Sequence, residues 1–198
     1  MFNLVIAGVG GQGGLTLSRI MADAAVCAGY SVRTGETLGM AQRGGSVLSF
    51  VRIGETVRSP LFSLGTADAL IGLEALEAVR ASKYIKTGGL ILVDPVREDT
   101  LTTLTKRDVY PPLQELMMEL AATGGLVHQI PASAESSRMG YPRAANALML
   151  GAFCAYIHIL PVSGVEESIL RVLRARGPPA VKMFRKGARI ARDGQIRQ

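Results

Sequence analysis

Residues 3–29, NLVIAGVGGQGGLTLSRIMADAAVCAG, decide the fold class of this chain. The apolar run at residues 3–8 is rich in branched side chains and leads into glycines, a pattern typical of a buried parallel strand. Residues 13–28 then place apolar side chains at helical spacing, and Gly29 is suited to end a helix because glycine readily adopts left-handed backbone angles. With a short strand at residues 31–34, this makes a strand–loop–helix–strand unit, the usual opening of an α/β fold.

The rest of the chain continues to alternate between strands and helices. We expect further strands at residues 46–53, 69–73, 89–93 and 126–130, and helices at residues 74–83, 112–122, 143–159, 165–174 and 179–192. Gly54 and Glu55 form the predicted turn of a β-hairpin whose returning strand covers residues 56–59. The sequence therefore predicts one domain over residues 1–198. Its expected fold is a three-layer α/β/α arrangement with a mostly parallel sheet, a Rossmann-like start and a β-hairpin insertion.

Charge is distributed unevenly along the 198 residues. The chain is 48% hydrophobic and 19% charged, which excludes a disordered protein, and its net charge is +6. Residues 171–198 alone carry +8, so the remainder carries −2. This basic, helical C-terminal segment is either a solvated helical face or a docking arm for an acidic partner. Phe184 is the only aromatic residue among these cations in the sequence, so a surface on which single-stranded nucleic acid would stack is not expected. We therefore predict no nucleic-acid partner.

Cysteine usage and hydropathy bear on the compartment. Cys27 and Cys154 lie in apolar helical stretches with no CxxC motif, so we expect no metal site, and two buried free thiols rather than a long-range disulfide. Residues 144–165 lack charge but include Asn146 and Pro161, which favours a buried helix over a membrane span. No basic region precedes the apolar start, so no signal peptide is expected. These features predict a cytoplasmic protein without a membrane partner.

The glycine loop after the first strand fits the pattern G-x-G-x-x-G through Gly8, Gly10 and Gly13, with Gly11 and Gln12 between them. Such a loop brings backbone N–H groups to a helix N-terminus, where phosphate or carboxylate is favoured. A dinucleotide site also needs an acidic residue near the end of the second strand. The nearest acid lies beyond residues 31–34, so the loop is expected to face an interface or a substrate phosphate. A free-standing NAD(P)- or flavin-binding reductase stays open as an alternative.

The second unusual segment is residues 36–46, ETLGMAQRGGS, which is rich in glycine and also carries charge. The guanidinium of Arg43 is suited to hold an anion with two hydrogen bonds, or else to pair with Glu36 and stiffen the loop. Because loops after neighbouring parallel strands leave the sheet at the same edge, we expect the two loops to lie side by side. The candidate residues of this second loop are Glu36, Gln42, Arg43, Gly44, Gly45 and Ser46.

These segments resemble one family. Residues 8–14, residues 36–46 and Val51–Arg52 resemble the gamma-type subunit of 2-oxoacid:ferredoxin oxidoreductases, above all the beta subunits that serve indolepyruvate. Residues 139–152 also look like a later motif of the family, and the resemblance covers nearly the whole chain. Two positions depart from it, because many members have His where Leu38 stands and Asn where Tyr141 stands.

The resemblance implies one subunit of a hetero-oligomer that is inactive alone. The family oxidatively decarboxylates a 2-oxoacid, with coenzyme A as co-substrate and ferredoxin as electron acceptor. Thiamine diphosphate and iron–sulfur clusters are expected on a large (alpha) partner subunit, with no cofactor, metal or catalytic residue in this chain alone. The two glycine-rich loops become ligand- or partner-facing surfaces. An arylpyruvate such as indolepyruvate is the expected substrate, and a gamma subunit for pyruvate or 2-oxoglutarate is the open alternative.

Overall fold

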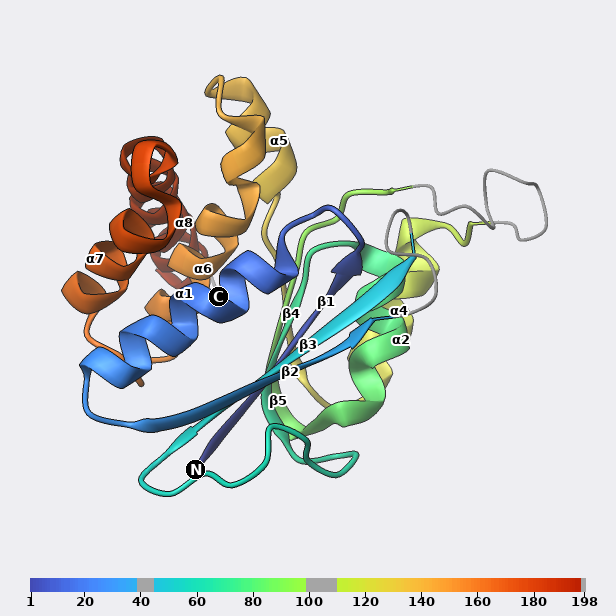
Figure 1. The fold of residues 1–198 in the computed structure, drawn as a ribbon. Helices are drawn as coiled ribbons and strands as arrows, with labels where there is room; N and C mark the ends of the chain where they lie inside the picture. The colour runs from blue at the N-terminus through green and yellow to red at the C-terminus, as the bar shows by residue number, and fades with distance from the viewer. Residues whose placement is uncertain (39–44, 99–109, 197–198) are drawn as a thin grey trace.

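A six-stranded sheet with the order β2-β3-β1-β4-β5-β6 forms the centre of the computed structural model, which describes residues 1–38, 45–98 and 110–196 (Figure 1). β1, β4, β5 and β6 run parallel, whereas β3 is antiparallel to both β1 and β2. The predicted α/β class is confirmed, and the sheet is mixed. The strands are β1 (Phe2–Val9), β2 (Ser31–Leu38), β3 (Ser46–Gly54), β4 (Ala67–Gly72), β5 (Ile85–Val93) and β6 (Leu126–Gln129).

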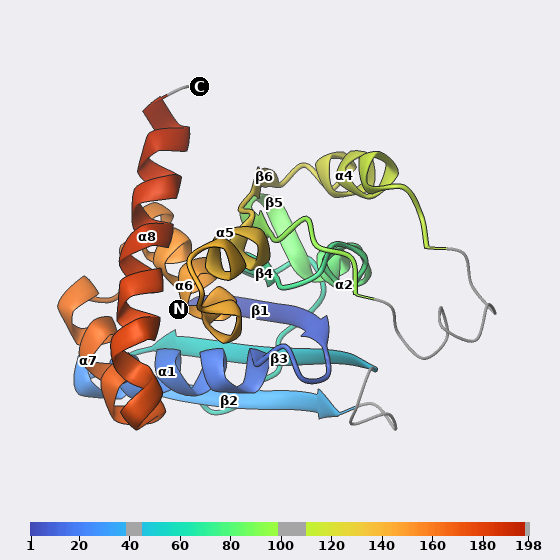
Figure 2. The same ribbon diagram turned by 90° about the horizontal axis from the view of Figure 1, so that it is seen from above.

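Helices cover both faces of this sheet, because successive side chains of its strands point to opposite sides. Leu4 and Ile6 of β1 lie in the larger core, and Val5 and Ala7 in the smaller one. The larger core is closed by α1 (Gly14–Cys27), α6 (Ala145–Tyr156), α7 (Val162–Leu173) and α8 (Gly177–Ile196). The smaller core is closed by α2 (Ala75–Ala81) and α4 (Leu113–Ala122) (Figures 1 and 2).

The predicted hairpin is wrong in its second strand. β3 pairs along its length with β2, from Ser31 opposite Gly54 to Leu38 opposite Val47, so residues 56–59 form no returning strand. The segment after β3 instead lies against the sheet. A side chain on Gly35 would meet Pro60 Cγ at 2.9 Å, and Arg52 Nη1 donates to the Leu61 carbonyl at 3.2 Å. The hairpin insertion is therefore made of β2 and β3.

Several element boundaries also differ from expectation. The second strand extends to Leu38, so Glu36 lies in a strand and not in a loop. The helix expected at residues 143–159 begins as a 3-10 turn, Pro142–Ala144, and α6 ends at Tyr156. α5 (Ala132–Arg138) was not predicted, because its short sequence of small and polar residues has no apolar stripe. No described helix is long and apolar enough to cross a membrane.

The C-terminal helix is part of the core. Met183 and Phe184 of α8 are fully buried against α6. The two helices touch backbone to backbone, since a methyl group on Gly151 would lie 1.8 Å from the Phe184 carbonyl oxygen. One on Gly187 would lie 1.9 Å from the Leu148 carbonyl oxygen. Glycine at these two positions is what permits the close approach.

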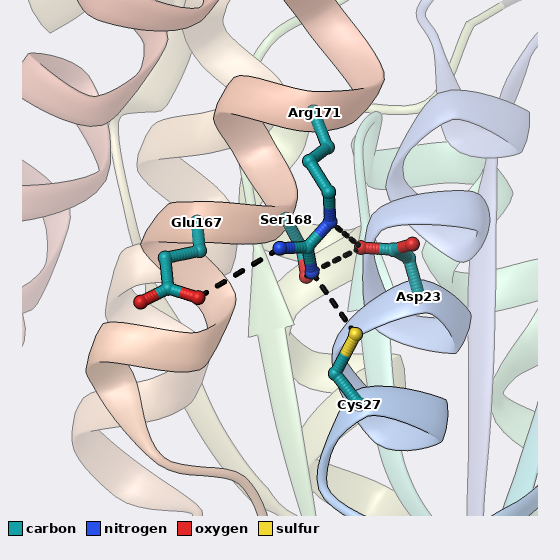
Figure 3. Close-up of polar contacts among 5 residues, drawn as sticks. All are labelled: Asp23, Cys27, Glu167, Ser168 and Arg171. Atoms are coloured by element: carbon teal, nitrogen blue, oxygen red, sulfur yellow. Dashed lines mark hydrogen bonds and ion pairs between the residues drawn. The ribbon is translucent and has the colours of Figure 1, made fainter.

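Arg171 joins α7 to α1 (Figure 3). Its Nε and Nη2 donate to Asp23 Oδ2 at 3.1 and 2.7 Å, and its Nη2 also lies 3.1 Å from Cys27 Sγ. One cation of the basic segment is thus used inside the chain. Cys27 is exposed, which corrects the expectation of two buried thiols, whereas Cys154 is buried; both are free. Cys27 is the last residue of α1, where the helix leaves its side chain exposed, and the apolar sequence around it does not indicate this exposure.

Candidate functional site

A cleft of about 790 Å³ opens at the carboxyl end of β1. One wall is the glycine loop, residues 9–13, and the other is residues 140–146, between α5 and α6. Asp94 and Ser133 lie at one side of the cleft, and Arg176 joins it from the start of the C-terminal helical segment. The carboxyl edge of parallel strands is where α/β folds place ligands. This cleft is therefore the candidate site.

The glycine loop owes its shape to left-handed backbone angles. Gly11 has φ +110° and Gly13 has φ +88°, values that side-chain-bearing residues rarely adopt. Gly13 is also the N-cap of α1 and brings no capping side chain. The first N–H groups of a helix lack intrahelical partners, and the helix dipole favours negative charge there. The loop thus presents an end of α1 that suits an anion.

Gln12 braces this loop. Its Oε1 accepts the Val9 N–H at 2.7 Å, and its Nε2 donates to the Leu73 carbonyl at 3.1 Å. Gly8 makes room for that amide, because a side chain there would lie 2.8 Å from Gln12 Oε1. In this structure the amide of Gln12 therefore ties the end of β1 to the end of β4, although the residue was expected to face a ligand or partner.

The two glycine-rich loops meet at their described ends. The Gly10 N–H donates to the Gly45 carbonyl at 2.8 Å, and Val9 pairs with Ser46. The expected reason was wrong, because β1 and β2 are not neighbours. β3 lies between them, and its antiparallel pairing with β1 brings the start of β3 to the end of β1.

The second loop is only partly described. Glu36 is half-buried within β2, opposite Ser49 of β3. Ser46 is the first residue of β3 and is exposed. Gln42, Arg43 and Gly44 lie outside the described residues, as does the question of a Glu36–Arg43 pair.

The opposite wall brings residues that were not predicted as site residues. Asn146 Nδ2 donates to the Gly13 carbonyl at 3.4 Å, and a side chain on Gly13 would lie 2.6 Å from that nitrogen. Arg143 and Arg176 are exposed and line the cleft, with no ion pair to another described residue. A cation at the N-terminal end of a helix interacts unfavourably with the helix dipole. The position of Arg143 at the start of a predicted helix was therefore the available sequence signal for a role other than helix stability. The cleft thus combines two guanidinium groups with a helix N-terminus.

Asp94 is 3% exposed and supports the rim. Its Oδ2 accepts from the Ser133 N–H at 2.8 Å and from Ser133 Oγ at 2.6 Å. Burial raises the pKa of this carboxyl, and the two Ser133 hydrogen bonds oppose that rise. Asp94 thus holds the start of α5 against the end of β5. Among the described residues, no cluster of His, Cys, Asp or Glu is arranged to hold a metal ion.

The sheet order disfavours the dinucleotide alternative. In a dinucleotide-binding fold the strand after the first helix lies beside β1, and its end carries the acid that holds the ribose. Here the neighbour of β1 on that side is the antiparallel strand β3, and Glu36 lies one strand further away on β2. The glycine pattern is therefore present without the strand that normally completes it.

Comparison with known proteins identifies the family of the chain. Residues 3–190 match the family described as pyruvate ferredoxin/flavodoxin oxidoreductase. The chain belongs to this family. The resemblance expected from the two loops is thereby confirmed. The indolepyruvate oxidoreductase subunit IorB of Archaeoglobus fulgidus is 38% identical over 175 residues, which cover 88% of this chain and 87% of that protein.

Solved structures of two oxoacid:ferredoxin oxidoreductases share the fold. The gamma subunit of a keto/oxoacid ferredoxin oxidoreductase from Geobacter sulfurreducens superposes with a TM-score of 0.71 at 25% identity, covering 96% of this chain and 98% of that one. The 2-oxoglutarate:ferredoxin oxidoreductase of Magnetococcus marinus gives 0.74 at 21% identity, covering 97% of this chain but 31% of that one. The same fold thus occurs as a separate gamma subunit and within a longer chain.

Proposed function

We propose that this chain is the small subunit of an indolepyruvate:ferredoxin oxidoreductase and is inactive until it binds a large subunit. The observation that carries the proposal is the correspondence with the IorB subunit over 88% of this chain and 87% of that protein. The gamma-subunit fold supports it along 96% of the chain. We place the assembled enzyme in the cytoplasm.

The reaction is the oxidative decarboxylation of an arylpyruvate. The bond between the 2-oxo carbon and the carboxylate breaks and releases CO₂. The remaining acyl group forms a thioester with coenzyme A, whose thiol releases its proton, and the two electrons of the oxidation pass to ferredoxin. Thiamine diphosphate supplies the carbanion chemistry and iron–sulfur clusters carry the electrons. We assign both cofactors to the large subunit, as the resemblance to the family implies.

This chain's own contribution is an anion-binding wall. Arg143, Arg176 and the N-terminus of α1 converge on the cleft, and such groups favour phosphate or carboxylate. We propose that the cleft and the two glycine-rich loops, with Arg43, face the partner's thiamine and coenzyme A site. The proposed role of the cleft is to bind and orient the phosphate-bearing end of coenzyme A.

The decisive experiment is coexpression of the chain with the large subunit. We expect the isolated chain to contain no thiamine or iron and to oxidise no 2-oxoacid. The complex should reduce ferredoxin with indolepyruvate and coenzyme A faster than with pyruvate or 2-oxoglutarate. Preference for pyruvate would contradict the substrate assignment, and activity of the isolated chain would contradict the subunit assignment.

The role of the cleft has a separate test in the assembled enzyme. Arg143→Gln should raise KM for coenzyme A roughly 10- to 150-fold, the value of a charged hydrogen bond of about 1.5–3 kcal/mol. Arg138→Gln is the matched control, since Arg138 is exposed on α5 outside the cleft and pairs with Glu135 at 2.8 Å. Equal KM values for coenzyme A in both variants would show that the cleft does not bind coenzyme A.

A further inference from the structure

One face of α8 carries a row of cations. Lys182, Arg185, Arg189 and Arg192 are all exposed and follow one another at intervals of three or four residues, which places them on one side of the helix. We call these four residues the α8 stripe. At 1.5 Å per residue the stripe is about 15 Å long. The opposite side of α8 is buried in the larger core.

The α8 stripe is held rigidly. The backbone contacts at Gly151 and Gly187 fix α8 on α6. Arg185 makes two hydrogen bonds to Glu166 of α7, at 2.7 and 2.6 Å, and the Lys182 ammonium lies 5.2 Å from the centre of the Tyr141 ring. The helix that carries the stripe is therefore fixed in place, and two of its four cations are held by contacts within the chain.

The outer half of the stripe has no partner within the chain. Neither Arg189 nor Arg192 forms an ion pair with any residue in the described part of the structure. Figure 2 shows the last turns of α8 projecting beyond the neighbouring elements. The guanidinium groups of Arg189 and Arg192 are thus exposed at the end of α8, where another molecule can contact them.

The chemistry of the stripe favours an acidic protein surface. Its members are all cations, without an exposed aromatic side chain on which nucleic-acid bases would stack. The apolar side of α8 is buried against α6, so the helix has no apolar face to insert into a membrane surface. Fixed charges at fixed spacing suit a second folded surface of opposite charge.

We propose that the α8 stripe is a docking surface for an acidic face of the large subunit. The proposal rests on the proposed function, which supplies that partner, and it concerns a surface separate from the cleft. Exposed ion pairs contribute little individually, so the stripe acts chiefly through association rate and partner selection. Its effect must weaken as salt rises.

The test uses the full chain carrying Arg189→Glu and Arg192→Glu together. Its affinity for the large subunit is measured at about 50 and about 200 mM salt. We expect roughly 10- to 100-fold weaker binding at low salt, because like charges then face each other, and a much smaller salt dependence. Unchanged thermal unfolding of the isolated chain will show that the variant is folded.

The matched control is Arg33→Glu with Arg58→Glu. Both arginines are exposed, on β2 and on the segment after β3, so the net charge changes equally at another surface. We expect the control to bind within about twofold of the unmodified chain. Equally weakened binding of the large subunit by both double variants would show that only net charge matters and would contradict the proposal. Unchanged binding by the stripe variant would exclude the docking surface.

Two further outcomes separate this proposal from its alternatives. If the stripe variant assembles normally but loses binding to a single-stranded RNA probe that the control still binds, the stripe is a nucleic-acid surface and the proposal is wrong. If the unmodified chain binds no large subunit, the proposed function fails. In that case, the binding of poly-glutamate to the unmodified chain, the stripe variant and the control variant is measured. Weaker binding by the stripe variant alone supports an acidic protein partner, and equally weak binding by both variants excludes it.

Discussion

Gln12 and Asn146 show how single residues shape the cleft from opposite sides. Gln12 uses its amide to fix the glycine loop, and Asn146 reaches across to the Gly13 carbonyl. The glycines at positions 11 and 13 were predictable, because a loop between a strand and a helix needs backbone angles that other residues resist. Arg176 was not predictable, because an isolated arginine in a sequence has no periodicity that marks it, and for Arg143 the one signal was its place at the start of a predicted helix.

Glu74 offers a test of burial at the residue scale. It is 1% exposed, accepts the Glu77 N–H at 2.8 Å and accepts the hydroxyl of Tyr110. Burial raises the pKa of Glu74 above its ordinary value of 4.5, against the hydrogen bond from Tyr110. The folded state therefore binds this proton more tightly than the unfolded state. Its contribution to stability is present at low pH and is lost as pH rises through the folded-state pKa.

We expect Glu74→Gln to gain stability relative to the unmodified chain as pH rises from about 4.5 towards neutrality. Glu166→Gln should do the opposite, because the hydrogen bond from Arg185 lowers the pKa of Glu166 and its contribution is present above the ordinary value. Urea unfolding measures the slope for Glu74→Gln above about pH 4.5, and the slope for Glu166→Gln below about pH 4.5, where the Glu166 carboxylate becomes protonated. Slopes of the same sign would show that one of the two environments is misassigned.

At the scale of elements, β2 and β3 explain most of the mismatch between sequence and structure. Strand 46–53 was predicted correctly, but its partners were not. Alternation of side chains identifies a strand, whereas pairing depends on which edge is free when the chain folds back. Gly54 suggested a turn to a returning strand, whereas β3 pairs with β2, the strand that precedes it in the chain.

The contact between α6 and α8 gives a prediction at this scale. Gly187→Ala places a methyl group 1.9 Å from the Leu148 carbonyl oxygen, so the helices must separate. Overpacking of this kind costs roughly 1–3 kcal/mol, more than the gain of about 1 kcal/mol from replacing glycine in a helix. The midpoint of denaturant unfolding should fall.

Gly194→Ala is the control for this substitution. It lies in the same helix, but a methyl group there meets only Tyr156 Oη at 4.0 Å. The same change should therefore raise the free energy of unfolding by up to about 1 kcal/mol, and the midpoint of denaturant unfolding should rise slightly. Stabilisation by both substitutions would mean that α6 and α8 are not in backbone contact.

At the scale of the whole molecule, the basic segment is both surface and core. Arg171, Arg185 and Lys186 pair with Asp23, Glu166 and Glu135 of earlier elements, so part of the +8 charge is balanced within the fold. The buried side of α8 covers α6, whose side chains are buried from Ala147 to Cys154. A segment that looks like a charged tail in the sequence closes the larger core.

Truncation tests this reading. A chain that ends at Arg176 loses Met183 and Phe184, whose burial contributes roughly 1.5–3 kcal/mol each against a typical total of about 5–15 kcal/mol. We expect it to be insoluble or unfolded by circular dichroism. A chain that ends at Gly194 keeps these side chains and should unfold cooperatively. A folded, soluble chain ending at Arg176 would show that α8 is an appendage.

The sequence by itself determined the α/β class, the strand–glycine loop–helix opening, most helices and the family, because these depend on local spacing and on short motifs. Only the tertiary structure decided the insertion of β3 beside β1, the meeting of Gly10 with Gly45, and the cleft formed with Arg143 and Arg176. It alone also divided α8 into a buried side and the α8 stripe. These features join residues far apart in the chain, and their energies depend on packing and pairing that no local pattern encodes.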